Sequence, residues 1–322
     1  HTSIRQVLEQ VGCQTTDIAP LKYLNIVKEA PFSSDCEQTL YLSTKLISGD
    51  AKIREESKWM TSDDCFNCAV KTNAMPMRVG PLVFGALGNK SPLTRELGTI
   101  LNHQEYPPGI IQIPMKSKTI KPFTTTNLVV IAPEEQVDEL ENEGCFAYGD
   151  ALVVDPGASI DSQDELAKII EALPRNLIVF VTHHHHDHID GLNVVQKVNP
   201  NARLLGHKST MQRITEDKWA SDQSAVSGGE RISVRGQILE TIYAPGHTDG
   251  HMCLLHVSSN CLIVGDHCVG KGSAALDLRA GGNMSDYFRT TYKFLEVSPN
   301  VLIPMHGKFN VWPKNMLCGY LK

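Results

Sequence analysis

Four consecutive histidines stand in the middle of this chain, inside the stretch VFVTHHHHDHIDG of residues 179–191. A purification tag would sit at a terminus and be followed by linker residues, whereas this run directly follows the apolar stretch NLIVFVT. Such a continuous apolar run is typical of a strand that is buried on both faces. The histidines therefore mark the end of a buried strand, where layered α/β proteins gather their functional side chains.

The run fits the pattern H-x-H-x-D-H, and this spacing predicts two metal ions. His183 and His185 stand two residues apart at a strand end, so both imidazoles can project from one side. The turn that follows can bring Asp187 and His188 to a second point nearby. Imidazole nitrogens and a carboxylate are good zinc ligands.

Three further strand ends supply candidate ligands, because one motif cannot close two metal sites. The stretch YAPGHTDGH offers His247, CLIVGDH offers Asp266, and VLIPMHG offers His306. One isolated histidine is usually a surface or core residue. Seven residues of the right type at four consecutive strand ends favour a metal centre instead.

In this order the four stretches resemble the ligand motifs of the metallo-β-lactamase fold superfamily, over residues 124–312. The resemblance implies an α/β fold in which two mixed sheets pack face to face with helices outside, a four-layer αββα sandwich. It also implies a ligand set with Asp266 bridging two zinc ions. The first zinc would be held by His183, His185 and His247, and the second by Asp187, His188 and His306.

The same resemblance implies a zinc-dependent hydrolase. A hydroxide held between two metals would attack a carbonyl carbon or a phosphorus, because metal binding lowers the pKa of water. Asp187 would be the catalytic residue, relaying a proton to the leaving group. His251, in the GHTxGH pattern, and Asp155, in VVDPG, would support the ligands from behind. Two zinc ions are expected, with iron or manganese as alternatives.

Differences from individual branches of the superfamily narrow the function. Asp266 stands where the best-known lactamases carry a cysteine, which argues against antibiotic hydrolysis as the main activity. Only a short segment separates Asp266 from His306, where the large RNA-processing nucleases insert a whole domain, so that class of nuclease is excluded. GHTDGHMCLLH, IVGDHCVGKGS and MSDYFRTTYKFLEV resemble the β-lactamase-like protein 2 family. The animal member of that family is regarded as a zinc-dependent endoribonuclease, which implies a phosphodiesterase that cuts single-stranded RNA.

Two alternatives stay open beside the endoribonuclease. A thioester hydrolase of the glyoxalase II kind would use the same metal chemistry with a different pocket. A non-catalytic metal-binding scaffold is the other. Residues 267–322 carry seven Lys or Arg against three acidic residues, which suits a phosphate backbone and a solvated helix face about equally.

The front of the chain resembles a degenerate Nudix domain of the plant-type branch. IRQVLEQVGC, residues 4–13, aligns with the second half of a Nudix box, R-E-x-x-E-E-x-G. Arg5, Glu9 and Gly12 are retained, but Gln6 and Gln10 replace acidic ligands. A magnesium site built on carboxylates loses most of its affinity when two become amides. A partial, non-catalytic Nudix-like segment is expected, and an ordinary helix that matches by chance is the alternative.

These patterns predict three parts of the chain. Residues 1–110 would be the partial Nudix-like segment, residues 111–123 a linker broken by Pro114 and Pro122, and residues 124–322 a metallo-β-lactamase domain truncated at its C-terminus.

Composition sets the remaining expectations. A net charge of −6 over 322 residues argues against non-specific binding to the phosphate backbone of nucleic acids. No apolar run reaches the ~18 residues of a membrane helix, so no membrane partner is expected. Nine cysteines without framework spacing favour a reducing intracellular compartment, cytoplasm or organelle. The start at His1 indicates a missing N-terminus. The expected partner is RNA or a small thioester, and the oligomeric state stays open, with a homodimer among the alternatives.

Overall fold

The computed structural model describes residues 2–28, 38–47, 104–105, 107, 109–133, 144–270, 272–307 and 313–322. The chain divides into two compact units, His1–Gly88 and Asn89–Lys322. Among the described residues, no helix is long and apolar enough to cross a membrane.

The first unit contains a helix and a two-stranded sheet within its described residues. Helix α1 (Thr2–Val11) is followed by Gly12, whose φ of 85° lies in the left-handed region that favours glycine after a helix. Strand β1 (Lys22–Lys28) pairs antiparallel with β2 (Gln38–Ser43). The Nudix-like interpretation of this part stays a prediction.

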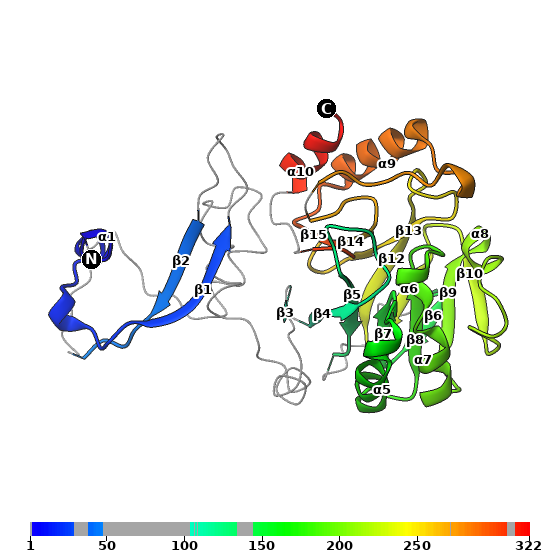
Figure 1. Cartoon of the computed structure of the whole chain (residues 1–322), viewed down its shortest axis with the longest axis horizontal. Helices are drawn as coiled ribbons and strands as arrows, with labels where there is room; N and C mark the ends of the chain where they lie inside the picture. Colours follow the sequence, from blue (N-terminus) through cyan, green and yellow to red (C-terminus); the bar gives the residue numbers. More distant parts are fainter. Residues whose placement is uncertain are drawn as a thin grey trace. The chain divides into compact units, whose positions relative to one another are not determined.

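The second unit is a sandwich of two sheets (Figure 1). The first sheet has the strand order β10-β9-β8-β7-β5-β4-β3, and the second has the order β15-β14-β13-β12-β11-β6. The strands of the first sheet are β3 (Gln104–Glu105), β4 (Ile110–Lys116), β5 (Thr125–Ile131), β7 (Ala151–Val154), β8 (Leu177–Val181), β9 (Arg203–His207) and β10 (Gln223–Val226). Those of the second are β6 (Ala147–Gly149), β11 (Arg231–Val234), β12 (Gln237–Tyr243), β13 (Met252–His256), β14 (Cys261–Gly265) and β15 (Val301–Pro304).

Helices pack against both sheets and complete the layers. Leu166 and Ile169 share one buried apolar cluster with Val179 of β8, and Phe294 and Leu317 belong to the other. The helices are α5 (Gln163–Ala172), α6 (His186–Ile189), α7 (Leu192–Val198), α8 (Lys208–Met211), α9 (Met284–Val297) and α10 (Pro313–Tyr320). Since α5 covers the first sheet and α9 and α10 cover the second, the predicted sandwich of two sheets between helices is confirmed.

Residues 111–116, which the sequence places in the linker, lie inside the first sheet. Strand β4 pairs antiparallel with β5 from Ile110 to Lys116. Pro114 fits because the described pairing of β3 reaches only Ile111 and Gln112, so its missing N–H falls where β4 has no described outer neighbour. The linker expectation therefore does not hold for these six residues, and a loop of residues 117–124 joins β4 to β5.

The candidate ligands follow strands whose carboxyl ends meet at one edge of the sandwich. Strand β8 is parallel to β7 and β9, and β14 is parallel to β15, so their following loops emerge on a common side. The backbone N–H of Met252 donates to the carbonyl of Thr182, which joins the two sheets beside the histidine run.

Candidate metal centre

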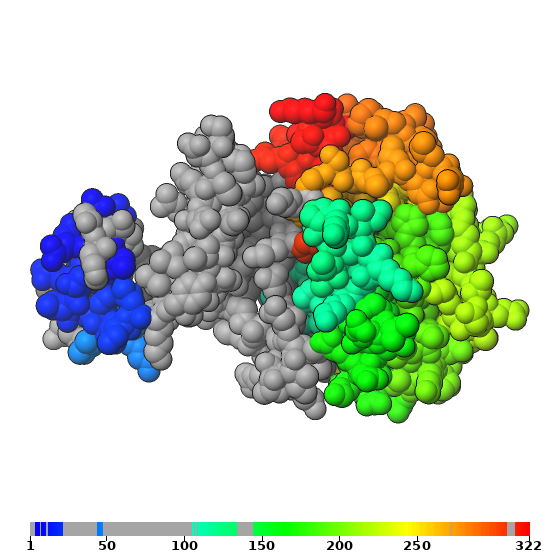
Figure 2. Space-filling model, viewed as in Figure 1, coloured from blue at the N-terminus to red at the C-terminus, as the bar shows by residue number. Residues whose placement is uncertain are grey.

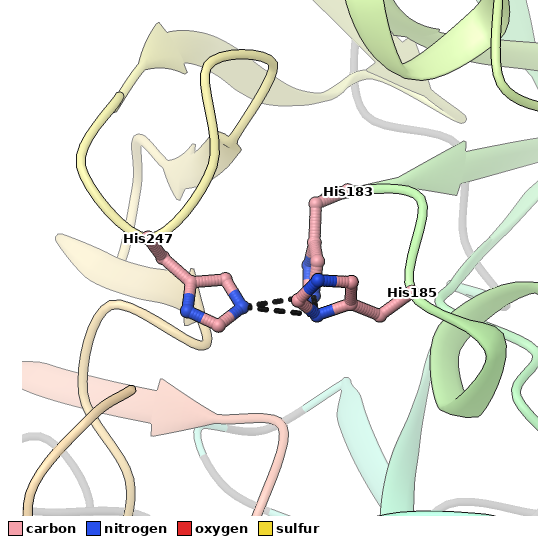
Figure 3. A group of neighbouring side chains, drawn as sticks. All are labelled: His183, His185 and His247. Carbon is pink, nitrogen blue, oxygen red and sulfur yellow. Dashed lines mark hydrogen bonds between the residues drawn. The ribbon is translucent and has the colours of Figure 1, made fainter. Parts of the chain in front are cut away.

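Three histidine nitrogens meet at one point (Figure 3). Nε2 of His183 lies 3.0 Å from Nδ1 of His185, and Nε2 of His247 lies 3.2 Å from both. Two nitrogens bound to one tetrahedral zinc at ~2.0 Å lie roughly 3.3 Å apart. The triangle of nitrogens therefore has the dimensions of one zinc site.

A second group lies beside the first and contains Asp187, His188 and His306. Nε2 of His306 is 3.3 Å from Oδ2 of Asp187, and Nε2 of His188 is 3.7 Å from Oδ1 of the same carboxylate. All three side chains are largely buried. Two imidazoles and a carboxylate form a second donor set of the type that divalent metals use.

Asp266 stands between the two groups. Its Oδ2 is 3.3 Å from Nε2 of His306, 3.5 Å from Nε2 of His188 and 3.8 Å from Nε2 of His247. One carboxylate oxygen therefore faces ligands of both groups, as a bridging ligand must. The structure thus brings together all seven residues that the sequence proposes as ligands.

Unpartnered polar atoms show that a cation fits this cluster. Nε2 of His188 and Oδ1 of Asp266 are buried and have no hydrogen-bond partner. A buried polar atom without a partner costs roughly 1–3 kcal/mol. Coordination of a divalent ion would use both atoms, so the donor set and its unmet bonds agree with a metal centre.

In the second group, the carboxylates stabilise positive charge on the neighbouring imidazoles. Burial opposes it, but the charges of Asp266, Asp187 and Asp155 hold the pKa of His188 well above its ordinary value. Likewise, hydrogen bonds to Asp187 and Asp266 overcome burial and raise the pKa of His306 to about 9. Protons and a metal ion compete for the same ring nitrogens, so these carboxylates would also stabilise a bound cation.

In the first group, burial keeps two of the imidazoles, those of His183 and His247, neutral. Burial, and then the neighbouring rings of His188 and His247, hold the pKa of His183 well below its ordinary value. Burial also lowers the pKa of His247. A neutral imidazole is the form that binds metal, so His183 and His247 can accept an ion without losing a proton.

Each of the five ligand imidazoles has a hydrogen-bond partner for its outer nitrogen. The contacts are His183 Nδ1 to Thr182 Oγ1 (3.0 Å), His185 Nε2 to Asp277 Oδ2 (3.0 Å), His188 Nδ1 to Asp155 Oδ2 (2.8 Å), His247 Nδ1 to the carbonyl of Ala275 (2.5 Å) and His306 Nδ1 to the carbonyl of Thr125 (3.0 Å). Acceptors at these positions keep the proton on the outer nitrogen and leave the inner lone pair free for a metal.

Asp155 is the buried centre of this support. Its carboxylate accepts hydrogen bonds from the backbone N–H of Thr182 (2.7 Å), the hydroxyl of Thr182 (2.6 Å) and the ring of His188 (2.8 Å). Because the Thr182 hydroxyl donates its proton to Asp155, it can only accept from Nδ1 of His183. One carboxylate thus orients a ligand in each group.

His251 supports Asp266 rather than a metal. The backbone N–H of Asp266 donates to Nε2 of His251 at 3.1 Å. Gly265, which precedes Asp266, has a φ of 57°, and a Cβ there would lie 2.4 Å from the same His251 nitrogen. The ring and the turn are therefore in close contact, as the sequence predicts for a residue behind the ligands.

Asp277 is a supporting residue that sequence reasoning missed. Besides holding His185, its carboxylate accepts from the backbone N–H groups of Arg279 and Ala280, and its own N–H donates to the carbonyl of His247. The surrounding letters, GSAALDLRAG, contain no ligand pattern. Only its place in the fold makes it part of the site.

We expect Asp277→Asn to lower the affinity for the metal by roughly 10- to 100-fold. The backbone donors would keep the amide oxygen, so the amide nitrogen would face His185 and force the ring proton onto Nδ1, the nitrogen aimed at the cluster. Competition with a chelating dye measures the affinity, with Asp161→Asn, an exposed carboxylate, as control. Equal affinities for variant and wild type would show that Asp277 does not hold His185.

The loop of residues 117–124 forms a wall beside His306. The hydroxyl of Thr119 lies 3.4 Å from Nε2 of His306, and the ring of Phe123 stacks on the same imidazole with centroids 5.5 Å apart. Lys118 is paired with Asp190, at the end of α6, at 2.9 Å. The loop thus contacts His306 and, through Asp190, the end of the helix that contains Asp187 and His188.

Comparisons with known proteins agree with this geometry. Residues 148–306 match the family model of the Metallo-beta-lactamase superfamily. The chain is 34% identical to a hydroxyacylglutathione hydrolase of Aeromonas hydrophila over 39% of this chain and 45% of that protein. It is 29% identical to an atrochrysone carboxyl ACP thioesterase of Emericella nidulans, over 48% of this chain and 47% of the relative. The chain thus spans about half the length, or less, of these curated relatives.

A solved structure shows the same fold. A beta-lactamase domain protein from Burkholderia ambifaria superposes with a TM-score of 0.55 and 19% sequence identity, over 68% of this chain and 74% of that chain.

Proposed function

Because residues 148–306 form a metallo-beta-lactamase superfamily domain, we propose that the protein is a metal-dependent hydrolase that cleaves thioesters. The observation that carries the hydrolase is the cluster of seven ligand-type residues, in which Asp266 faces both groups. The thioester follows from the names of the relatives, a hydroxyacylglutathione hydrolase and an ACP thioesterase. This order reverses the expectation from sequence, which placed single-stranded RNA first.

The seven residues would hold two divalent ions, with zinc proposed first and iron or manganese as alternatives. The bound ions would supply an electrophile for the carbonyl oxygen and a nucleophile at neutral pH. Water adds to the acyl carbon, the carbon–sulfur bond breaks, and the released thiolate takes up a proton.

Asp187 is the carboxylate proposed to carry that proton. Although burial opposes it, the charge of His188 and the hydrogen bond from His306 lower the pKa of Asp187 to about 2, so its carboxylate is ionised. Its two oxygens lie at the edge of the second group, 3.3 Å from His306 and 3.7 Å from His188. From this position its ionised carboxylate would pass a proton from water to the leaving sulfur.

The test compares three substrates on the metal-loaded protein. An S-acyl glutathione and an acyl N-acetylcysteamine thioester are followed by thiol release, and labelled single-stranded RNA is run beside them. We expect thiol release by the wild type and its loss in His185→Ala, with Asp161→Asn unchanged. RNA cleavage without thiol release would overturn the thioester proposal in favour of a nuclease. No reaction by the fully loaded protein would favour a metal-binding scaffold.

A further inference from the structure

A cavity of about 500 Å³ lies between α9, α10 and the segment Gly272–Leu276. In Figure 2 the surfaces of α9 and α10, in orange and red, adjoin on one face of the unit. The larger apolar and aromatic side chains of the lining are Leu276, Met284, Tyr287, Phe288, Met316 and Tyr320, and Ser273, Asn315 and Lys322 are its polar members. Its volume lies in the range of ~300–1,000 Å³ that is typical of small-molecule sites.

The two tyrosines present their rings rather than their hydroxyls to this cavity. The hydroxyl of Tyr287 donates to the carbonyl of His267, at 2.5 Å. The hydroxyl of Tyr320 accepts from the N–H of Val269 at 2.9 Å and is 3.0 Å from the carbonyl of the same residue. Because these hydroxyls are engaged by backbone, the lining favours an apolar ligand over a polar one.

The apolar surface continues outward along α9. Met284, Phe288 and Tyr292 follow one another at four-residue intervals, which places them on one face of the helix. Their exposed fractions are 53%, 37% and 58%. A contiguous row of exposed apolar side chains is one of the features that mark a binding surface.

The cavity shares its wall with the metal centre. Leu276 lines the cavity and stands between Ala275, whose carbonyl holds His247, and Asp277, whose carboxylate holds His185. On another side, the segment bonded by Tyr287 and Tyr320 begins one residue after Asp266. A ligand in the cavity is therefore only one segment of chain away from three of the seven ligand-type residues.

We propose that this cavity binds the acyl chain of the substrate, an unbranched aliphatic chain of medium length, while its thioester group lies at the metal centre. The inference rests on the proposed thioester hydrolysis and specifies its substrate class. It assigns the linear apolar part of the substrate to the cavity and leaves the carbonyl to the metals and Asp187.

Gly319 allows the cavity to be filled without disturbing the fold. It lines the cavity on α10, and a Cβ at this position would meet nothing within 4 Å. Gly319→Leu places an apolar side chain in the space proposed for the acyl chain. Gly319→Ala is the matched control, because it makes the same helix-compatible change and adds a single methyl group.

The experiment measures KM and kcat for acetyl, hexanoyl and decanoyl N-acetylcysteamine thioesters on the metal-loaded full chain. In the wild type we expect KM to fall by up to roughly fourfold for each methylene that becomes buried. In Gly319→Leu we expect KM for the decanoyl thioester to rise at least ~10-fold while KM for the acetyl thioester stays the same. Gly319→Ala should behave as the wild type.

Calorimetric binding of S-decyl N-acetylcysteamine, a thioether that cannot be hydrolysed, separates this inference from the proposed activity. If no thioester is cleaved but the thioether binds and Gly319→Leu abolishes its binding, the apolar site stands and the hydrolysis proposal fails. If thioesters are cleaved with no effect of chain length and the thioether does not bind, the acyl site is overturned. A change of oligomeric state in Gly319→Leu, with chain-length dependence unchanged, would instead assign this face to contacts between copies.

Discussion

Asp266→Asn is expected to leave a folded protein that has lost one metal ion and nearly all hydrolysis. Oδ2 of Asp266 lies within 3.8 Å of three histidine Nε2 atoms, drawn from both ligand groups. An amide at this position removes the negative charge that the two groups share. Metal content should fall from about two ions per chain to about one. Because a metal acting on the carbonyl oxygen is worth several kcal/mol, kcat/KM should fall by roughly 10³-fold or more.

Elemental analysis of the protein after gel filtration measures the metal content, and thiol release measures the activity. Asp161→Asn is the matched control, because it removes one carboxylate from the surface and should change neither quantity. Retention of both ions by Asp266→Asn would contradict the bridging role. Loss of one ion with undiminished activity would show that the reaction needs a single ion.

Asp155→Asn is expected to shift the ring protons of two histidines, one in each ligand group. The amide oxygen would be retained by the backbone N–H of Thr182, which leaves the amide nitrogen facing His188. That ring must then accept at Nδ1 and carry its proton on Nε2, the atom that faces the cluster. The Thr182 hydroxyl, freed from Asp155, would donate to Nδ1 of His183 and shift the proton of that ring as well.

Two misplaced ring protons should lower metal affinity by roughly 10²-fold or more, since loss of one such outer partner costs 10- to 100-fold. The metal-free protein should also lose about 2–4 kcal/mol of its free energy of unfolding, because three hydrogen bonds to a buried charged carboxylate are replaced by weaker neutral ones. Chelator competition and urea denaturation measure the two effects. Thr182→Ser, which keeps the hydroxyl, should retain the affinity. An equally weakened serine variant would indicate a general packing defect rather than misplaced protons.

Sequence reasoning was sufficient for the core of the site because the ligand residues are chemically distinctive and sit at strand ends. The HHHHDH run contributes four of the seven members, and the strands before His247, Asp266 and His306 are visible as apolar runs. Parallel pairing of β8 with its neighbours and of β14 with β15 then requires the following loops to emerge together. Asp155 and His251, proposed from short motifs, contact His188 and Asp266.

The predicted linker at residues 111–123 shows where a prediction from neighbouring residues alone fails. Pro114 argues against a strand when the sequence is read locally, yet β4 pairs with β5 along its length. A proline is tolerated in a strand when its ring faces a position with no hydrogen-bond partner. Strand order decides that condition, and strand order is a property of the whole sheet.

By itself, the sequence determined the fold class and the residue types of the candidate metal centre, because both depend on residue identity and on short-range periodicity. Only the tertiary structure decided which groups hold those residues in place. Asp277 and the carbonyls of Ala275 and Thr125 are bonded to imidazoles far away in the chain. The cavity between α9 and α10 likewise arises from separate segments. A backbone carbonyl or a lone aspartate belongs to no sequence motif. Its role depends on the neighbours that long-range packing brings to it.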